Sequence, residues 1–360
     1  MRESDAKAGV RLKTAALDSG ARLQGSARST RRRTLMVCLS LLAALLMAIV
    51  ITSVIGSQRL PVSSSLCALL TNGGDACGLT AQQRAILLDI RLPRIFLAAI
   101  TGASLAAAGA AYQALLRNPL AEPYLLGVSN GAAVGTMIAL VFFGAQEWSR
   151  PLMAFAGALL ATFAVYQLAR GRTGATPERL ILAGVIVTTF LSSAIVFITT
   201  LMDATRIRSF TFWLLGDLSG TSSRLLGMGA AAALVGVVVL TFNARSLNLL
   251  MLGERDAFDL GVEVVRVRLM VFLAASLLVG ASVASSGSVG YVGLVVPHLV
   301  RLSFGSDNRT AIPASALAGG LFVVVADTVA RTIIAPRELP VGAITALIGA
   351  PLFIYLLRRG

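Results

Sequence analysis

The sequence predicts an all-α polytopic membrane protein with about ten transmembrane helices. Hydrophobic residues make up 56% of the 360-residue chain and charged residues only 13%, too few to cover the surface of a soluble protein of this size. Between Arg94 and Arg117 lie 22 residues without a charge. As a helix rising about 1.5 Å per residue, this run spans a hydrocarbon core of roughly 30 Å. It is therefore a membrane-spanning helix.

The chain divides into a basic tail and one transmembrane domain. Residues 1–33 are polar and carry nine basic residues, and we expect a disordered cytoplasmic tail. The domain covers 34–358. Its apolar runs lie at 34–56, 95–116, 124–143, 151–169, 180–202, 225–242, 268–285, 289–304, 312–334 and 341–357. The first run is longer than a signal-peptide core and no small-residue cleavage site follows it, so we interpret it as a retained span.

Two of these boundaries depend on local signals. A single helix over 268–304 would be about 50 Å long, so we expect a break at Gly287 and Gly290. The run 95–116 ends before Pro119 and Pro123, which cannot continue a helix. Within that run, small residues recur at spacings that let another helix approach closely: Gly102, Ala106, Gly109 and Ala110.

The distribution of positive charge predicts the topology. With an even number of spans, 21 Lys and Arg residues lie on the side of the termini and 10 on the other, which places both termini in the cytoplasm. Without the nine residues of the tail the difference is only 12 against 10. Topology therefore leaves the outer arginines unexplained: Arg91, Arg94, Arg206, Arg208, Arg331 and Arg337.

The residue inventory argues against several kinds of function. The net charge of +14 is explained by arginines between spans, so we do not infer nucleic-acid binding. Lysine occurs only at Lys7 and Lys13, which excludes a P-loop.

We find no catalytic constellation and expect no enzyme, cofactor or metal site. The single histidine, His298 beside Pro297, is interpreted as a structural residue at a kink.

Three polar segments interrupt the apolar pattern. Residues 244–268 mix apolar and charged positions and predict one or two amphipathic helices outside the bilayer that suit a partner, with a solvated linker as the alternative. Residues 203–223 carry aromatic residues beside arginines and resemble an interfacial helix. Asp327 and Arg331 lie one helical turn apart and can form an ion pair.

The cysteines leave one question open. Cys67 and Cys77 flank a polar loop on the predicted outer side, where a disulfide between them and two free thiols are both compatible with the sequence.

Several segments, in order, resemble the permease subunits of type II ABC importers for iron-siderophore complexes, haem and cobalamin. They are RLPR from Arg91, QALLRNPLAEPYLLGVSNG from Gln113, GERDAFDLG from Gly253, GYVGLVVPHLVR from Gly290, ADTVAR from Ala326 and ELPVGAITALIGAP from Glu338. The resemblance covers about 90–358. It implies the type II ABC importer permease fold of ten helices, paired as a homodimer.

The resemblance also implies partners in the bacterial inner membrane. Two copies of a separate ABC ATPase subunit would hydrolyse ATP and push on the coupling segment 244–268, through Leu252, Gly253, Glu254, Arg255, Asp256, Phe258, Leu260 and Gly261. A periplasmic substrate-binding protein would dock through its carboxylates on Arg91, Arg94 and Arg331. The translocation path would be lined by Thr188, Thr189, Ser192 and Ser193, and its outer mouth by Arg206 and Arg208.

The substrate stays open among a ferric siderophore, haem and cobalamin. An ion-coupled secondary transporter is the alternative, although such carriers usually place ionisable residues near mid-membrane, where this sequence offers few. A passive membrane scaffold is the third hypothesis.

Overall fold

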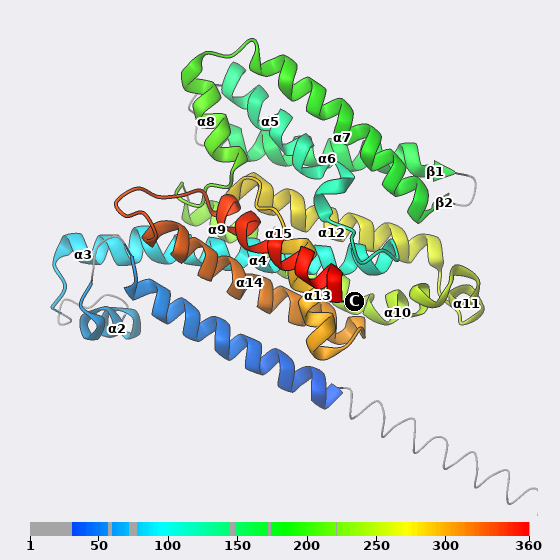
Figure 1. Cartoon of the computed structure of the whole chain (residues 1–360), viewed down its shortest axis with the longest axis horizontal. Helices are drawn as coiled ribbons and strands as arrows, with labels where there is room; N and C mark the ends of the chain where they lie inside the picture. Colours follow the sequence, from blue (N-terminus) through cyan, green and yellow to red (C-terminus); the bar gives the residue numbers. More distant parts are fainter. Residues whose placement is uncertain are drawn as a thin grey trace, which may run out of the picture.

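The computed structural model describes residues 31–56, 60–71, 78–143, 148–171, 174–220 and 222–359. Its helices run mostly along one direction (Figure 1). One end of the molecule holds α2 (Val62–Leu70), α3 (Ala81–Ala85) and α8 (Ala204–Leu214). The opposite end holds the hairpin of β1 (Arg170–Gly171) and β2 (Gly174–Ala175) with α10 (Ala244–Leu252) and α11 (Glu254–Asp259). We call these the α8 end and the α10 end.

Between the two ends lie the other helices, most of them long. They are a first helix over Arg31–Val54, η2 (Ile86–Arg91), α4 (Leu92–Leu115), η3 (Pro123–Leu126), α5 (Val128–Phe142), α6 (Ser149–Ala169), α7 (Pro177–Thr199), α9 (Ser223–Phe242), α12 (Val264–Ser286), α13 (Val292–Phe304), α14 (Asn308–Thr332) and α15 (Val341–Arg359). Among the described residues seven helices are long and apolar enough to cross a membrane, and α5, α13 and α15 are shorter apolar helices. The predicted all-α polytopic fold is confirmed.

The second span is longer than predicted. It was expected from Ile95, but a continuous helical segment of 35 residues runs from Ala81 to Leu115. Its start is stabilised because Thr80 and Gln83 form a reciprocal capping box. The six residues of η2 then join α3 to α4 through π-helical turns. The apolar pattern missed this extension because residues 81–91 are partly polar.

The predicted break between the seventh and eighth spans is confirmed. The helix α12 ends at Ser286, and Gly287 follows with a φ of 68°, which favours glycine. Helix α13 starts only at Val292. Gly293, in the first turn of α13, lies against Gly109 in α4 and against Pro123, so the non-helical residues 287–291 end at a close contact with the interior of α4. Such backbone is tolerated within a membrane only because protein surrounds it.

Helix α4 is the centre of the bundle. In the most apolar window of the span Ala81–Leu115, 78% of the residues are buried, whereas the first helix is mostly exposed and its buried residues are Val37, Leu45, Thr52 and Ser53. It packs against α14, α12, α13 and α9, and Figure 1 shows it between α12 and α14. The carbonyl of Gly319 lies where a Cβ on Gly102 would be, and the carbonyl of Gly293 lies where a Cβ on Gly109 would be. The small residues predicted to allow close packing do so at both positions.

The N-terminal tail and the cysteines are described only in part. Residues 1–30 of the predicted tail lie outside the described residues, and the first helix begins at Arg31, three residues before the predicted span. Cys67 is disulfide-bonded, Cys38 is a free thiol and Cys77 lies outside the described residues.

The glycine contacts make a stability prediction. We expect Gly109→Leu to lower the free energy of unfolding by about 1–3 kcal/mol or more, because its side chain must displace the Gly293 backbone. Gly227→Leu on α9 is the control, since apart from the adjacent backbone of α9 itself no atom lies within 4 Å of the new Cβ. Thermal unfolding of both purified variants in detergent checks this. Equal midpoints for the two would contradict the central role of α4.

Candidate functional site

The segment 244–268 forms two short helices at the α10 end, as the amphipathic pattern predicted. Gly253 joins them with a φ of 146°. Their apolar residues divide into two sets. Leu247, Leu250 and Ala257 are buried against the bundle, whereas Leu252, Phe258 and Leu260 are each more than 60% exposed. An exposed apolar patch of this kind beyond the membrane-spanning helices suits a partner protein.

The charged residues of this segment tie it to the bundle. Glu254 accepts from Arg117 at 3.3 Å and from Arg268 at 2.5 Å, both through Oε1. Arg268 is buried, and its other terminal nitrogen donates to the carbonyl of Ala175 at 2.5 Å. Ala175 lies directly before α7. One guanidinium therefore connects the start of α11 with the turn that leads into α7.

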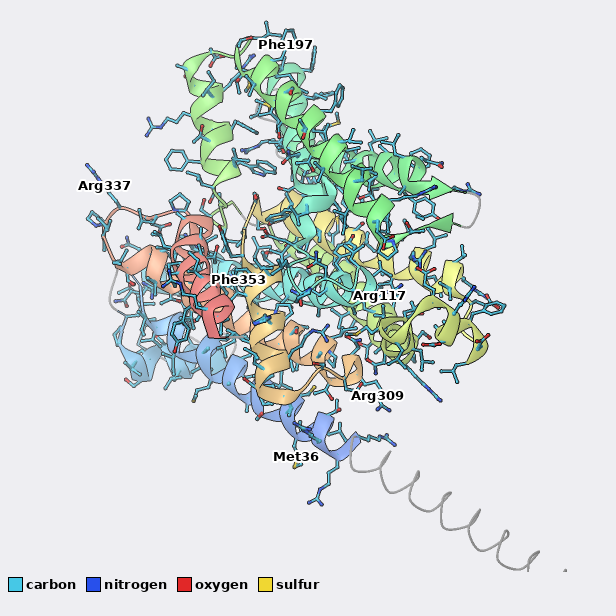
Figure 2. The ribbon with its side chains drawn as sticks, turned by 45° about the vertical axis from the view of Figure 1, so that its right-hand side comes forward. Met36, Arg117, Phe197, Arg309, Arg337 and Phe353 are labelled. Atoms are coloured by element: carbon cyan, nitrogen blue, oxygen red, sulfur yellow. The ribbon has the colours of Figure 1, made fainter. Side chains whose placement is uncertain are left out.

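A second attachment holds α10. The side chain of Asn248 donates to Asp307 at 2.7 Å and accepts from Asn308 at 2.8 Å. Burial raises the pKa of Asp307, but hydrogen bonds from Arg309 and Asn248 outweigh it and leave the pKa below its ordinary value. Asp307 caps α14, so α10 moves with the start of that helix. Figure 2 shows Arg117 and Arg309 on this side of the molecule.

The short 3-10 helix η3 and the non-helical segment between α12 and α13 meet in the interior. Tyr124 in η3 donates its hydroxyl hydrogen to the Val289 carbonyl and accepts from the Val289 amide, both at 2.9 Å. The Glu122 carboxylate accepts from the amide of Tyr291 at 3.0 Å. The buried amide and carbonyl of the break are thereby satisfied. The sequence did not reveal this role, because Tyr124 and Glu122 lie 165 and 169 positions along the chain from the residues they bond.

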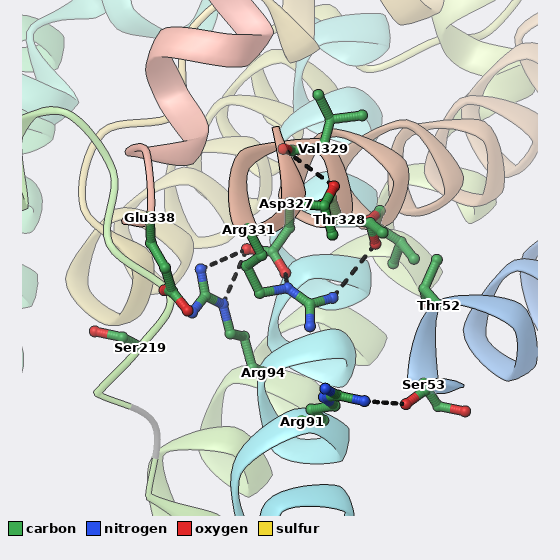
Figure 3. A network of polar contacts seen from close by, with 12 residues as sticks. Thr52, Ser53, Arg91, Arg94, Ser219, Asp327, Thr328, Val329, Arg331 and Glu338 are labelled. Carbon is green, nitrogen blue, oxygen red and sulfur yellow. Dashed lines mark hydrogen bonds and ion pairs between the residues drawn. The ribbon is translucent and has the colours of Figure 1, made fainter. Parts of the chain in front are cut away.

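The α8 end carries a cluster of buried charges. Asp327 lies between two arginines: its Oδ1 accepts from Arg94 Nε at 3.0 Å and its Oδ2 from Arg331 Nε at 2.9 Å (Figure 3). Arg94 also donates to Glu338 at 2.6 Å. The predicted Asp327–Arg331 ion pair is confirmed. A third arginine, Arg91, donates to the carbonyls of Ser53 and Val54 at 3.2 and 3.3 Å.

This cluster shows how three of the outer arginines are covered within the chain. Arg91, Arg94 and Arg331 are only 4%, 8% and 4% exposed. Their guanidinium groups bond carboxylates and carbonyls of the same chain, so they present little surface to carboxylates of another protein. The sequence placed them near the membrane surface but did not show which groups of the chain would cover them.

The predicted path residues lie on a poorly covered face of α7. Thr189, Ser192 and Ser193 are exposed and Thr188 is half-buried. The hydroxyls of Thr189 and Ser193 donate to carbonyls one turn earlier, at 2.9 and 3.1 Å. Asn130 in α5 donates to the Ser192 hydroxyl at 2.8 Å and to the Thr188 carbonyl at 3.1 Å. These internal bonds leave a mildly polar surface.

The predicted interfacial helix is α8. Asp203 caps it and pairs with Arg206 at 3.1 Å, and the Arg208 guanidinium lies 5.9 Å from the centre of the Phe212 ring. Both arginines are exposed. His298 lies elsewhere, edge-on to Phe353 of α15 with ring centres 6.2 Å apart.

Comparison with known proteins agrees with this architecture. The model of the FecCD transport family matches residues 41–359. The chain is 45% identical over 282 residues to the cobalamin import system permease protein BtuC of Halobacterium salinarum, covering 78% of this chain and 75% of that protein. It is 40% identical over 279 residues to the hemin transport system permease protein HmuU of Yersinia pestis, covering 76% of this chain and 83% of that protein.

A solved structure of a metal-chelate type ABC transporter in an inward-facing conformation has the same fold. Its TM-score is 0.78 at 30% sequence identity, and the match covers 91% of this chain and 100% of that chain. The chain therefore belongs to the FecCD transport family and has the fold of an ABC transporter permease.

Proposed function

We propose that this protein is the membrane permease of an ATP-driven importer that moves cobalamin, haem or another iron complex into the cytoplasm of a bacterium. The family match over 41–359 carries the proposal, supported by relatives that are named for cobalamin and hemin transport. The chain would reside in the inner membrane with both termini in the cytoplasm. The α10 end is then the cytoplasmic end and the α8 end the periplasmic one.

In this proposal an ATPase subunit grips the exposed patch of Leu252, Phe258 and Leu260. Its movement would reach the bundle through Glu254, since Arg117 and Arg268 hold that carboxylate. The hydrogen bond of Arg268 to Ala175 would carry the displacement to the beginning of α7. The other predicted coupling residues, Gly253, Arg255, Asp256 and Gly261, surround this contact in sequence.

A second copy of the chain would complete the translocation path. The exposed face of α7, with Thr188, Thr189, Ser192 and Ser193, would form one wall. Because the hydroxyls of Thr189, Ser192 and Ser193 bond within the chain, they would hold a bulky ligand weakly. The exposed residues Arg206 and Arg208 on α8 would attract anionic groups at the mouth.

A periplasmic binding protein is the proposed source of substrate. The buried residues Arg91, Arg94 and Arg331 would support its docking site indirectly, because Arg94 fixes Glu338 and with it the loop that carries Arg337. Arg337 is exposed at the rim of the molecule, as Figure 2 shows. We therefore propose Arg337 as the arginine of this loop that meets a carboxylate of the binding protein.

The exposed patch of Leu252, Phe258 and Leu260 gives the first prediction about the proposed function. Phe258→Asp should weaken capture of the co-expressed ATPase subunit by about tenfold or more, which is the loss of affinity expected when a hot-spot residue of an interface is replaced. Thermal stability of the isolated permease should hardly change, because Phe258 is 71% exposed. The control is Phe242→Asp, since Phe242 is 84% exposed at the nearby end of α9. Equal capture by both variants would place the ATPase elsewhere.

The buried charges give the second prediction. Asp327→Asn leaves Arg94 and Arg331 close together without the carboxylate between them, and we expect a loss of about 3–5 kcal/mol of stability. Glu338→Gln should cost much less, because the Glu338 side chain is 43% exposed. Thermal unfolding in detergent compares the two. A larger loss for the Glu338 variant would mean that Asp327 is not the centre of the cluster.

The energy source gives the third prediction. Proteoliposomes that contain the permease and its ATPase subunit should take up hemin or cyanocobalamin, delivered by the cognate binding protein, only with ATP. Glu122→Gln should retain this uptake, because the amide oxygen can still accept from Tyr291. Uptake by the permease alone under a pH gradient, abolished by Glu122→Gln, would instead establish the ion-coupled alternative.

A further inference from the structure

A crevice between α6, α9 and α12 has no role in the proposed transport path. It has a volume of about 160 Å³, and nearly all of its wall is apolar. Phe155 of α6, Leu225 and Met228 of α9, and Ala281 and Ala284 of α12 line it. The crevice lies near the starts of α6 and α9 and near the end of α12, at the opposite ends of α9 and α12 from the coupling segment.

The crevice opens toward the surroundings of the bundle. Two residues of its wall, Leu152 and Met228, are 65% and 61% exposed. In a membrane protein, exposed leucine and methionine side chains at this position face acyl chains. Gly229 at the back of the crevice is buried. A cavity of about 150 Å³ with apolar walls can hold a benzene ring, so this one can take a segment of a hydrocarbon chain.

The rim of the crevice has the opposite chemistry. Trp148 lines it, and the Arg224 guanidinium lies 5.5 Å from the centre of the indole ring. Helix α6 begins at Ser149 and α9 at Ser223, so Arg150 and Arg224 both lie in first turns. Two helix N-termini and two arginines thus lie beside the apolar crevice, and tryptophan and arginine are typical of the membrane interface.

The positive charge at the rim is not neutralised within the described part of the chain. Neither first turn contains an acidic residue. No ion pair of Arg150 or Arg224 occurs among the described residues, which do not include Glu147. Elsewhere at the α8 end, by contrast, Arg94, Arg206 and Arg331 are each paired with a carboxylate.

We propose that this crevice binds an anionic phospholipid of the leaflet in which α6 and α9 begin. One acyl chain occupies the crevice between Phe155, Met228 and Ala284. The phosphate lies between Arg150 and Arg224, where guanidinium groups and two helix N-termini favour negative charge. The inference depends on the membrane location of the chain and not on its transported substrate.

The test counts lipid that remains on the purified full-length protein. The protein is reconstituted with mixtures of phosphatidylglycerol and phosphatidylcholine, extracted mildly and analysed by native mass spectrometry. We expect preferential retention of phosphatidylglycerol. Arg224→Gln should weaken it about fivefold, in line with about 1 kcal/mol for each basic residue near an anionic lipid. The matched control is Arg208→Gln, because Arg208 also lies over an aromatic ring at the α8 end.

A second pair of variants tests the crevice itself. A Cβ on Gly229 would lie 3.9 Å from Ile100 and from Ser285, which is ordinary contact, so Gly229→Ala fits and leaves most of the space open. Gly229→Phe fills the crevice and should abolish preferential retention, while its unfolding midpoint in lipid-free detergent shows whether it is folded.

The proposal is overturned by any of four results. The first is equal retention of the two lipids by the unaltered protein. The second is an equal loss in the Arg224 and Arg208 variants. The third is retention by a folded Gly229→Phe variant that matches Gly229→Ala. The fourth is cross-linking from Met228→Cys to a second copy of the chain with no lipid bound, which would show that protein and not lipid covers the crevice.

Discussion

The close approach of backbones around α4 is the constraint on which the rest of the structure depends. Lipid supplies no hydrophobic drive for helices to associate, so packing must supply the attraction. At Gly102 and Gly109 the carbonyls of Gly319 and Gly293 occupy the space of a side chain. This lets α14 and α13 lie directly on α4.

Close packing in turn permits polar groups that lipid would not tolerate. Breaking α12 from α13 frees backbone amides and carbonyls in the interior, and Glu122 and Tyr124 satisfy them from the facing segment. Asp327 is paired on both sides, so neither it nor its arginines is left unbonded. A loose bundle would admit lipid to these sites, and the same groups would then cost several kcal/mol each.

The core also connects the two ends of the molecule. Helix α4 begins beside Arg94 in the buried charge cluster and ends just before Arg117, which bonds Glu254 of α11. The contacts of Arg268 add a route from the same carboxylate to the start of α7. In the proposed transport cycle, movement at the α10 end would thus reach α7 by a short polar link, while α4 stays as the rigid reference.

Much of the fold was predictable from composition and spacing. The ten apolar runs correspond to helices because a chain in hydrocarbon must satisfy its backbone locally, which leaves few choices. The break at Gly287, the two short helices of 244–268 and the Asp327–Arg331 pair all follow from signals within a few residues. The extension of the second span to Ala81 did not, because capping rather than hydrophobicity determines where it starts.

The sequence by itself determined which segments are apolar enough to enter the membrane and which charges lie near one another on a helix. Only the tertiary structure decided that Arg91, Arg94 and Arg331 are covered, that Glu122 meets Tyr291 and that Arg268 reaches Ala175. The physical reason is distance along the chain. Periodicity and capping act over a few residues, whereas the contacts of Arg91 with Ser53, Arg268 with Ala175, Glu122 with Tyr291 and Arg94 with Asp327 join residues 38 to 233 positions apart. They exist only once the helices have packed.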